Sequence, residues 1–234
     1  MTDIAILPIG SYEWHGNHLP LHTDCLIAEA IARCIAEANL YSSLVLPTIG
    51  LSCSHEHRDS ISLRPETLST MVREIIEVVQ MQGAASIVVL VNAQSGNHVL
   101  YSLAQELNRG VPKVLLFPRK QNWAKAAAVS GIEGDVYQDV HAGEIETSIM
   151  LATRPELVDK DKAWDDITAE MPLMHVLGMD GYSKNGILGR PSLATPDKGK
   201  GILRSLVDQC NAELQTLFDR CETHIPTQPW STRR

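Results

Sequence analysis

A group of carboxylates and imidazoles near the N-terminus is the part of the sequence best suited to chemistry. The stretch SYEWHGNHLPLHTD, residues 11–24, contains Glu13, His15 and Asp24. Such groups are costly to bury unless they pair or bind a cation. Glu13 and His15 are two apart, so in an extended segment their side chains leave the same face. With Asp24 they form an oxygen and nitrogen ligand set that suits Zn²⁺, Mn²⁺ or Fe²⁺. Asp24 also precedes a helical pattern, where capping that helix is the alternative role.

A second acidic segment, HAGEIETS, begins at His141 and includes Glu144 and Glu146. The spacing predicts a helix over 143–153, with both glutamates in its first turns. Carboxylates are favoured there by the helix dipole, which is the purely structural explanation of the two acids. That explanation does not account for His141, whose imidazole titrates near neutral pH and suits proton transfer.

Two further polar segments are candidates to face a substrate. SCSHEHRD, residues 52–59, contains Ser54, His55 and His57, and NAQSGN, residues 92–97, contains Gln94 and Ser95. A loop of alternating charges is often simply solvated, which is the alternative for the first segment. Trp14 lies between two candidate ligands, where it either stacks on a flat substrate or packs in the interior.

The elements that must position these residues follow an alternating pattern. Four apolar runs predict strands, and helical spacing of apolar residues lies between and after them. The continuous apolar run over 85–93 is typical of a strand buried on both faces. The predicted strands cover 4–10, 43–48, 85–93 and 113–118, and the predicted helices cover 26–38, 68–79, 143–153 and 201–221. This order predicts an α/β fold with a mostly parallel central sheet covered by helices on both sides.

The polar segments directly follow predicted strands. Residues 11–24 follow the first strand, residues 52–59 follow the second and residues 92–97 follow the third. Ligands of open α/β sheets bind beyond the carboxyl ends of the strands. We therefore expect the three segments to converge on one edge of the sheet.

Composition limits the classes of partner. The chain has 234 residues and a net charge of −8, and its basic residues do not cluster beyond pairs such as Arg233-Arg234, which argues against nucleic acid as a partner. We find no apolar run of membrane-spanning length and no leader-like start. Five scattered cysteines without a CxxC pair indicate reduced thiols. These features predict a single cytoplasmic domain over 1–234.

Four blocks of the sequence resemble the creatininase (creatinine amidohydrolase) family. They are GSYEWHGNHLPLHTD, SISLRPETL, HAGEIETSIML and GILGRPSLATPDKG, in the family's order, and the similarity extends over roughly 4–222. The length and the last block are closer to the short branches, which include formamidopyrimidine deformylases and mycofactocin peptidases, than to creatininase proper. The resemblance implies a three-layer α/β/α fold in a homo-oligomer, a hexamer being one possibility, with one or two divalent metals (Zn, Fe or Mn).

The resemblance also implies roles for individual residues. Glu13, His15 and Asp24 would be metal ligands, with Asp24 a candidate bridge between two ions. Glu146 would be a further ligand and His141 a proton-transfer residue.

One segment departs from the family pattern. The third strand of the family normally leads into NGHGGN or NGHYEN, whose histidine, and glutamate where present, bind metal. Here Gln94 and Gly96 stand at those positions. An amide is a weaker ligand for borderline metals than imidazole. Either one metal position is weakened or lost, or this branch has different chemistry, and we expect Gln94 to contact the substrate.

Two functions are consistent with these residues. The first is a metal-dependent hydrolase of a non-peptide C–N bond in a cyclic amide, lactam or formamide, with His141 as proton donor and with Glu144, or Glu146 if it does not bind metal, as a proton shuttle. The second is a divergent member of the family that catalyses ring opening or dehydration, or a non-catalytic binding protein. The first hypothesis takes a small molecule as its substrate.

Overall fold

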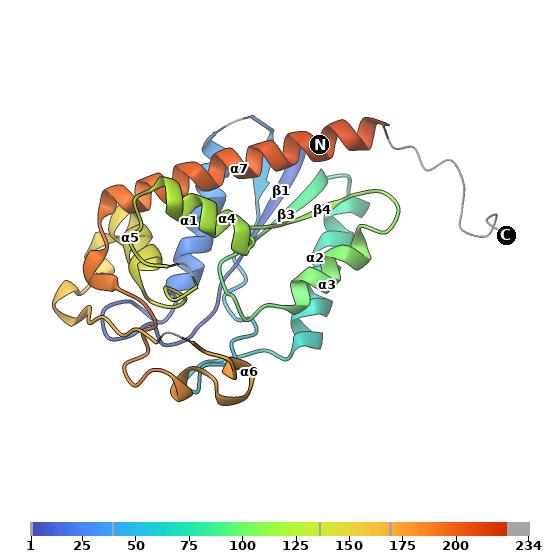
Figure 1. Ribbon diagram of the computed structural model, residues 1–234. Helices are drawn as coiled ribbons and strands as arrows, with labels where there is room; N and C mark the ends of the chain where they lie inside the picture. The colour runs from blue at the N-terminus through green and yellow to red at the C-terminus, as the bar shows by residue number, and fades with distance from the viewer. Residues whose placement is uncertain (1, 39, 136, 169, 224–234) are drawn as a thin grey trace.

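The sheet has four parallel strands in the order β2-β1-β3-β4. The computed structural model describes residues 2–38, 40–135, 137–168 and 170–223, with side chains up to residue 220. The strands are β1 (Thr2–Ile9), β2 (Ser43–Val45), β3 (Ala85–Asn92) and β4 (Val114–Phe117). β1 and β3 are the two central strands, and they pair along their whole length, with Ile6 opposite Val89 (Figure 1).

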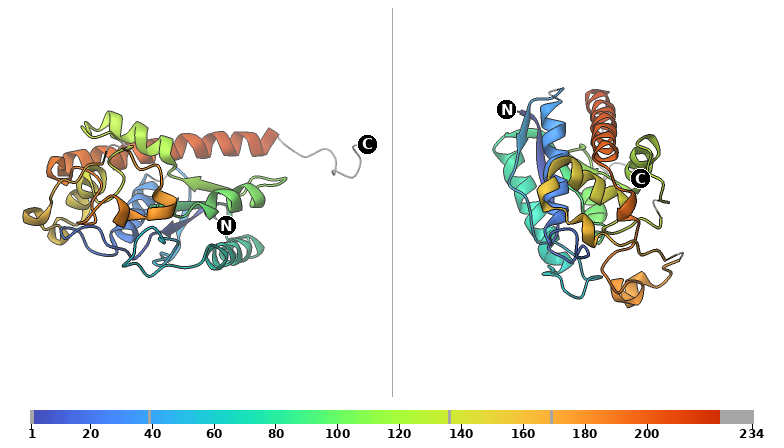
Figure 2. Two further views of the ribbon diagram at one scale, coloured as in Figure 1. Left: turned by 60° about the horizontal axis from the view of Figure 1, so that its bottom comes forward. Right: turned by 90° about the vertical axis from the view of Figure 1, so that its left-hand side faces the viewer.

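Helices cover both faces of this sheet. The α-helices are α1 (Thr23–Glu37), α2 (Pro65–Met81), α3 (Val99–Leu107), α4 (Lys120–Val129), α5 (Glu144–Thr153), α6 (Met174–Leu177) and α7 (Pro196–Thr223). Four short 3₁₀ turns, η1 to η4, cover Pro155–Leu157, Lys160–Lys162, Met179–Gly181 and Pro191–Leu193. Figure 2 shows α2 on one side of the sheet and α7 on the other.

The alternation of side chains along β1 explains the three layers. Ile4 and Ile6 are buried in a cluster with residues of α1, α4, α5 and α7. Ala5 and Leu7 point to the opposite face and are buried with residues of α2 and α3. Because successive residues of a strand face opposite sides, one strand contributes to both cores. The predicted α/β/α sandwich around a parallel sheet is confirmed.

The predicted boundaries differ from the structure where proline or glycine is involved. β2 ends at Val45, before Pro47, which has no N–H for the ladder, and pairing with β1 resumes at Ile49. α7 begins at Pro196, five residues before its predicted start. It includes Gly199, where a Cβ atom would lie 2.0 Å from the Ser148 carbonyl oxygen of α5. Glycine is present there because the two helices cross closely, not because the helix stops.

Further sequence expectations concern two short helices, the cysteines, the C-terminal arginines and membrane-spanning helices. α3 and α4 were not predicted, because their short apolar patterns lie between stronger signals. Four cysteines, Cys25, Cys34, Cys53 and Cys210, are free thiols, and nothing is described of the Cys221 side chain. Arg233 and Arg234 lie outside the described residues. Within the described ranges, no helix is long and apolar enough to cross a membrane.

Candidate metal centre

Three loops meet at the carboxyl edge of the sheet, as predicted. Glu13 follows β1, His57 follows β2 and Gln94 follows β3, and all three side chains are buried. His57 Nε2 lies 3.0 Å from Glu13 Oε1. Gln94 Nε2 donates a hydrogen bond of 2.5 Å to Glu13 Oε2. The carboxylate of Glu13 is therefore contacted from two other loops, one on each oxygen.

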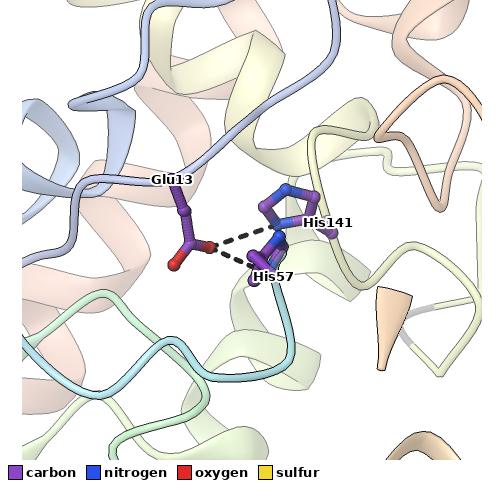
Figure 3. A group of neighbouring side chains, drawn as sticks. All are labelled: Glu13, His57 and His141. Atoms are coloured by element: carbon purple, nitrogen blue, oxygen red, sulfur yellow. Dashed lines mark ion pairs between the residues drawn. The ribbon is translucent and has the colours of Figure 1, made fainter. Parts of the chain in front are cut away.

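The segment before α5 adds His141 to this group. His141 pairs with Leu188 through backbone hydrogen bonds in both directions, of 3.1 and 2.8 Å, which fixes the segment beside the strand ends. His141 Nδ1 lies 3.7 Å from Glu13 Oε1, and the rings of His57 and His141 are 4.3 Å apart. Figure 3 shows both imidazoles directed at the same carboxylate oxygen.

A second group of side chains adjoins the first. His15 Nε2 lies 3.0 Å from Asp24 Oδ1 and 3.8 Å from Glu146 Oε2. Ser11 donates a hydrogen bond of 2.7 Å to the other oxygen of Asp24. Asp24 lies within the first turn of α1, whose N-cap residue is His22, so the helix-capping alternative for Asp24 is wrong. Its carboxylate faces the interior because that turn lies against the loop after β1.

Backbone carbonyls fix which ring nitrogen of two histidines carries the proton. His15 Nδ1 lies 3.1 Å from the carbonyl oxygen of Glu13, and His141 Nε2 lies 2.7 Å from that of Trp14. A carbonyl only accepts, so these nitrogens donate. In neutral rings, His15 Nε2 then presents a lone pair to Asp24, and His141 Nδ1 presents one to Glu13. Facing acceptors require a proton or a cation between them.

Burial shifts the pKa values of these groups. Removal from water raises the pKa of Glu13 well above its usual value and that of Glu146 to about 7. Burial lowers the pKa of His57 to about 4 and that of His141 well below its usual range. Burial also opposes protonation of His15, but the neighbouring carboxylates outweigh it and raise its pKa to about 10. A divalent cation would favour charged carboxylates and neutral imidazoles instead.

The arrangement fits a divalent transition metal. Glu13 Oε1 is buried and has no hydrogen-bond partner. Three groups of described residues place their ligand atoms within 4.8 Å of one another, namely Glu13–His57–His141, His15–His141–Glu146 and Glu13–His15–Asp24. Glu13, His15 and His141 each belong to two of these groups and Asp24 to one, and a bridging role for Asp24 stays a prediction. The donors are oxygen and nitrogen, the set that suits Zn, Mn and Fe.

Glu144, a predicted proton shuttle, is not brought to this group. Its carboxylate is fully buried and contacts Lys198 Nζ at 2.5 Å and the backbone N–H of Gly134 at 2.9 Å. Residues two apart on a helix do not face the same side, so Glu144 and Glu146 diverge. Glu146 instead accepts a hydrogen bond of 2.7 Å from the Ala142 N–H and faces His15.

The residues predicted to face a substrate are distributed over different environments. His55 and Ser95 are exposed, and Trp14 is partly buried beneath Gly186, where a Cβ atom would lie 2.7 Å from the indole ring. Ser54 is fully buried, and its Oγ has no hydrogen-bond partner. His57, predicted with these residues, lies instead among the metal-ligating candidates.

Asp139 is a structurally important residue that sequence reasoning missed. It is buried and accepts hydrogen bonds from the backbone N–H groups of Glu144, Ile145 and Arg190, so it holds the start of α5 from outside the helix. A Cβ atom at Gly143 would lie 2.4 Å from its carboxylate. In the sequence, the signal for this role of Asp139 was the nearby glycine at position 143.

The fold and this arrangement describe an α/β protein with a candidate metal centre, and comparisons with known proteins place it in a family. The family model described as creatinine amidohydrolase matches residues 1–214. The chain belongs to the creatininase family of hydrolases. Its sequence is 31% identical over 221 residues to the "Mycofactocin precursor peptide peptidase" of Mycobacterium tuberculosis (strain CDC 1551 / Oshkosh), covering 88% of this chain and 82% of the relative. It is 28% identical over 225 residues to the "Creatinine amidohydrolase" of Pseudomonas putida, covering 87% and 85%.

Solved structures agree with this assignment. A structure titled "Creatininase Mn" superposes with a TM-score of 0.77 at 27% identity, covering 92% of this chain and 91% of that one. A mutant creatininase described as the Zn-Zn type gives the same TM-score, identity and coverage. The metals named in these titles are among those that the donor set of this chain suits.

Proposed function

We propose that this protein is a metal-dependent amidohydrolase that cleaves a C–N bond of a small cyclic amide, lactam or formamide. One or two divalent ions (Zn, Fe or Mn) would be held by Glu13, His15, Asp24 and Glu146. The observation that carries the proposal is the buried Glu13–His15–Asp24 group, whose ligand atoms all lie within 4.8 Å of one another, with His15 Nε2 and Asp24 Oδ1 3.0 Å apart. A divalent cation held by these atoms would replace the proton that otherwise joins His15 and Asp24.

Some residues of the chain would bind the metal, and His141 would transfer a proton. A bound divalent ion would supply a Lewis acid that polarises the substrate carbonyl and lowers the pKa of water towards ~7. His141 is held by the Trp14 carbonyl through Nε2, so Nδ1 is the atom that would accept a proton and return it to the leaving nitrogen. The lowered pKa of His141 keeps this nitrogen unprotonated at the start.

Substrate contacts are proposed for residues at the rim of this group. Trp14 offers a flat ring beside the ligands, and the exposed His55 and Ser95 stand on the loops after β2 and β3. Ser54 has a buried hydroxyl that lacks a partner. These side chains would orient the substrate rather than take part in bond cleavage.

A peptide substrate is the second candidate. It is favoured by the similarity to a protein named as a precursor peptide peptidase, at 31% identity over most of both chains. Hydrolysis of a peptide amide and of a lactam amide would require the same two contributions, polarisation of the carbonyl by the metal and proton transfer by His141. The choice between them therefore depends on what the rim admits, and substrate profiling decides it.

The experiment is elemental analysis followed by a substrate panel. The purified protein should contain at least one Zn, Mn or Fe ion per chain. Chelation should abolish hydrolysis of the preferred substrate among lactams, N-formyl compounds and short peptides, and one of these ions should restore it. Well under one ion per chain after reconstitution would contradict the proposal.

We also propose that residues 1–234 form one domain that assembles into a homo-oligomer in the cytoplasm. This part rests on the family membership and on the free thiols of the described cysteines. Sedimentation at micromolar concentration tests it, because a stable 25.7 kDa monomer is incompatible with the proposed assembly.

A further inference from the structure

Besides His141, two nitrogen-bearing side chains approach Glu13, each from a loop that follows a strand. His57 reaches Oε1 from the loop after β2, with Nε2 at 3.0 Å. Gln94 reaches Oε2 from the loop after β3, with Nε2 at 2.5 Å. Either position is therefore close enough to Glu13 to share an ion with it. The difference between the two lies in what each nitrogen can offer.

The amide nitrogen of Gln94 is committed to donating hydrogen bonds. Its Nε2 lies 2.5 Å from Glu13 and 3.3 Å from Glu56 Oε1, so the NH₂ group points at two carboxylates. An amide nitrogen carries two hydrogens and has no lone pair free for a metal. Gln94 consequently holds Glu13 by one oxygen and leaves the other, Oε1, without a hydrogen-bond partner.

The loop after β2 also fills the space beside residue 96. A Cβ atom on Gly96 would lie 2.4 Å from Glu56 Oε1 and 2.7 Å from the Cys53 carbonyl oxygen. No side chain at position 96 can coexist with the Glu56 carboxylate where it stands. The loop after β2 therefore fills the space that a side chain at position 96, on the loop after β3, would need.

His57 is held in place by its own loop. Its backbone N–H donates to the Ser54 carbonyl at 3.1 Å, and the preceding carbonyl, that of Glu56, accepts from the Met179 N–H at 2.8 Å. The His57 side chain is 6% exposed. A buried imidazole fixed in this way is arranged for coordination before any ion arrives.

We infer that the loop after β2, through His57, supplies the nitrogen ligand beside Glu13, while Gln94 positions Glu13 without binding the ion. This inference rests on the proposed metal-dependent function. It explains how the chain can keep a metal position although it has Gln94 where the family pattern has histidine. The ligand has moved from one loop to its neighbour.

Exchanging the two side chains tests the inference. Zn²⁺ affinity would be measured by competition with a chromophoric chelator for the wild type, His57→Gln, and the double variant His57→Gln/Gln94→His. His57→Gln should weaken binding by at least about 100-fold, since loss of a ligand exceeds the 10–100-fold effect of outer partners. The double variant should recover at least tenfold of that loss, because residue 94 also reaches Glu13. His55→Gln, an exposed histidine of the same loop, is the matched control and should bind Zn²⁺ like the wild type.

A further variant covers the case in which His57→Gln does not fold. Gln94→Ala should keep one ion per chain with affinity within about tenfold to 100-fold of the wild type, as expected for a positioning residue. Wild-type affinity in a folded His57→Gln, or complete loss of the ion in Gln94→Ala, would overturn the inference and leave the proposed function standing. No ion in the wild type would instead refute the proposed function itself.

Discussion

Two carboxylates of the first turn of α5, Glu144 and Glu146, are neutralised in different ways. Glu144 is fully buried, and its charge is matched by Lys198 Nζ at 2.5 Å and by backbone N–H groups. Glu146 is 19% exposed and faces His15 at 3.8 Å. Among the described residues, no lysine or arginine pairs with Glu146, whose ion pair is with His15 alone.

The difference separates an acid that the chain neutralises with its own lysine from one that is a candidate metal ligand. Where the chain supplies its own cation, as at Glu144, the carboxylate joins helix, loop and α7 and has no capacity left for a ligand. Around Glu13 and Glu146, the described side chains that face the acids are imidazoles and the neutral amide of Gln94, so the site has an excess of acceptors. A buried excess of that kind is satisfied by protons or by an external cation.

The largest expected effect on Zn²⁺ affinity comes from removing the charge of a candidate ligand. Glu13→Gln should weaken Zn²⁺ binding by more than about 100-fold, because Glu13 belongs to two of the three candidate ligand groups. Glu144→Gln is the matched control and should retain wild-type affinity. Zn²⁺ competition titrations on both folded variants check the pair. An equal loss of Zn²⁺ affinity in the two variants would contradict the difference proposed between Glu13 and Glu144.

A smaller effect is expected from removing the internal cation. Lys198→Met leaves Glu144 buried without its partner, which should lower the free energy of unfolding by about 1–3 kcal/mol, below the value for a fully buried pair because the Lys198 side chain is 15% exposed. Metal content should not change. Chemical denaturation and elemental analysis measure the two quantities. A variant of undiminished stability would show that the ion pair contributes little.

The smallest effect is a pH dependence at His18, which contacts the residue after Glu146. Thr147 lies 2.9 Å from Nε2 of the buried His18, whose pKa is lowered by burial to about 4. The unfolded chain takes up a proton near pH 6.5 and the folded chain does not, so stability falls as the pH drops from 6.5 towards 4. The loss attributable to His18 should be roughly 1 kcal/mol between pH 6.5 and 5.5.

Thermal unfolding against pH tests that dependence. His18→Gln should flatten the acid side of the Tm profile, whereas His22→Gln, at an exposed histidine, should leave it unchanged. Identical profiles for the wild type and His18→Gln would mean that other groups govern the acid loss of stability.

Much of the architecture followed from local patterns. The apolar run over 85–93 predicted β3 to within one residue, because a strand buried on both faces needs apolar side chains throughout. The convergence of three loops followed from the rule that parallel strands end at one edge. Helices α3 and α4 escaped prediction because they are short, at 9 and 10 residues, and lie between stronger apolar signals.

Within the candidate site, the sequence by itself determined which side chains were available and which short-range pairs would share a face, as for Glu13 and His15. It did not separate His55 from His57, which share one loop, and it assigned both Glu144 and Glu146 to the site although side chains two apart on a helix diverge. Only the tertiary structure decided these cases. Whether an imidazole is exposed, or whether a carboxylate meets Lys198 or His15, depends on chain segments distant in sequence that burial brings together.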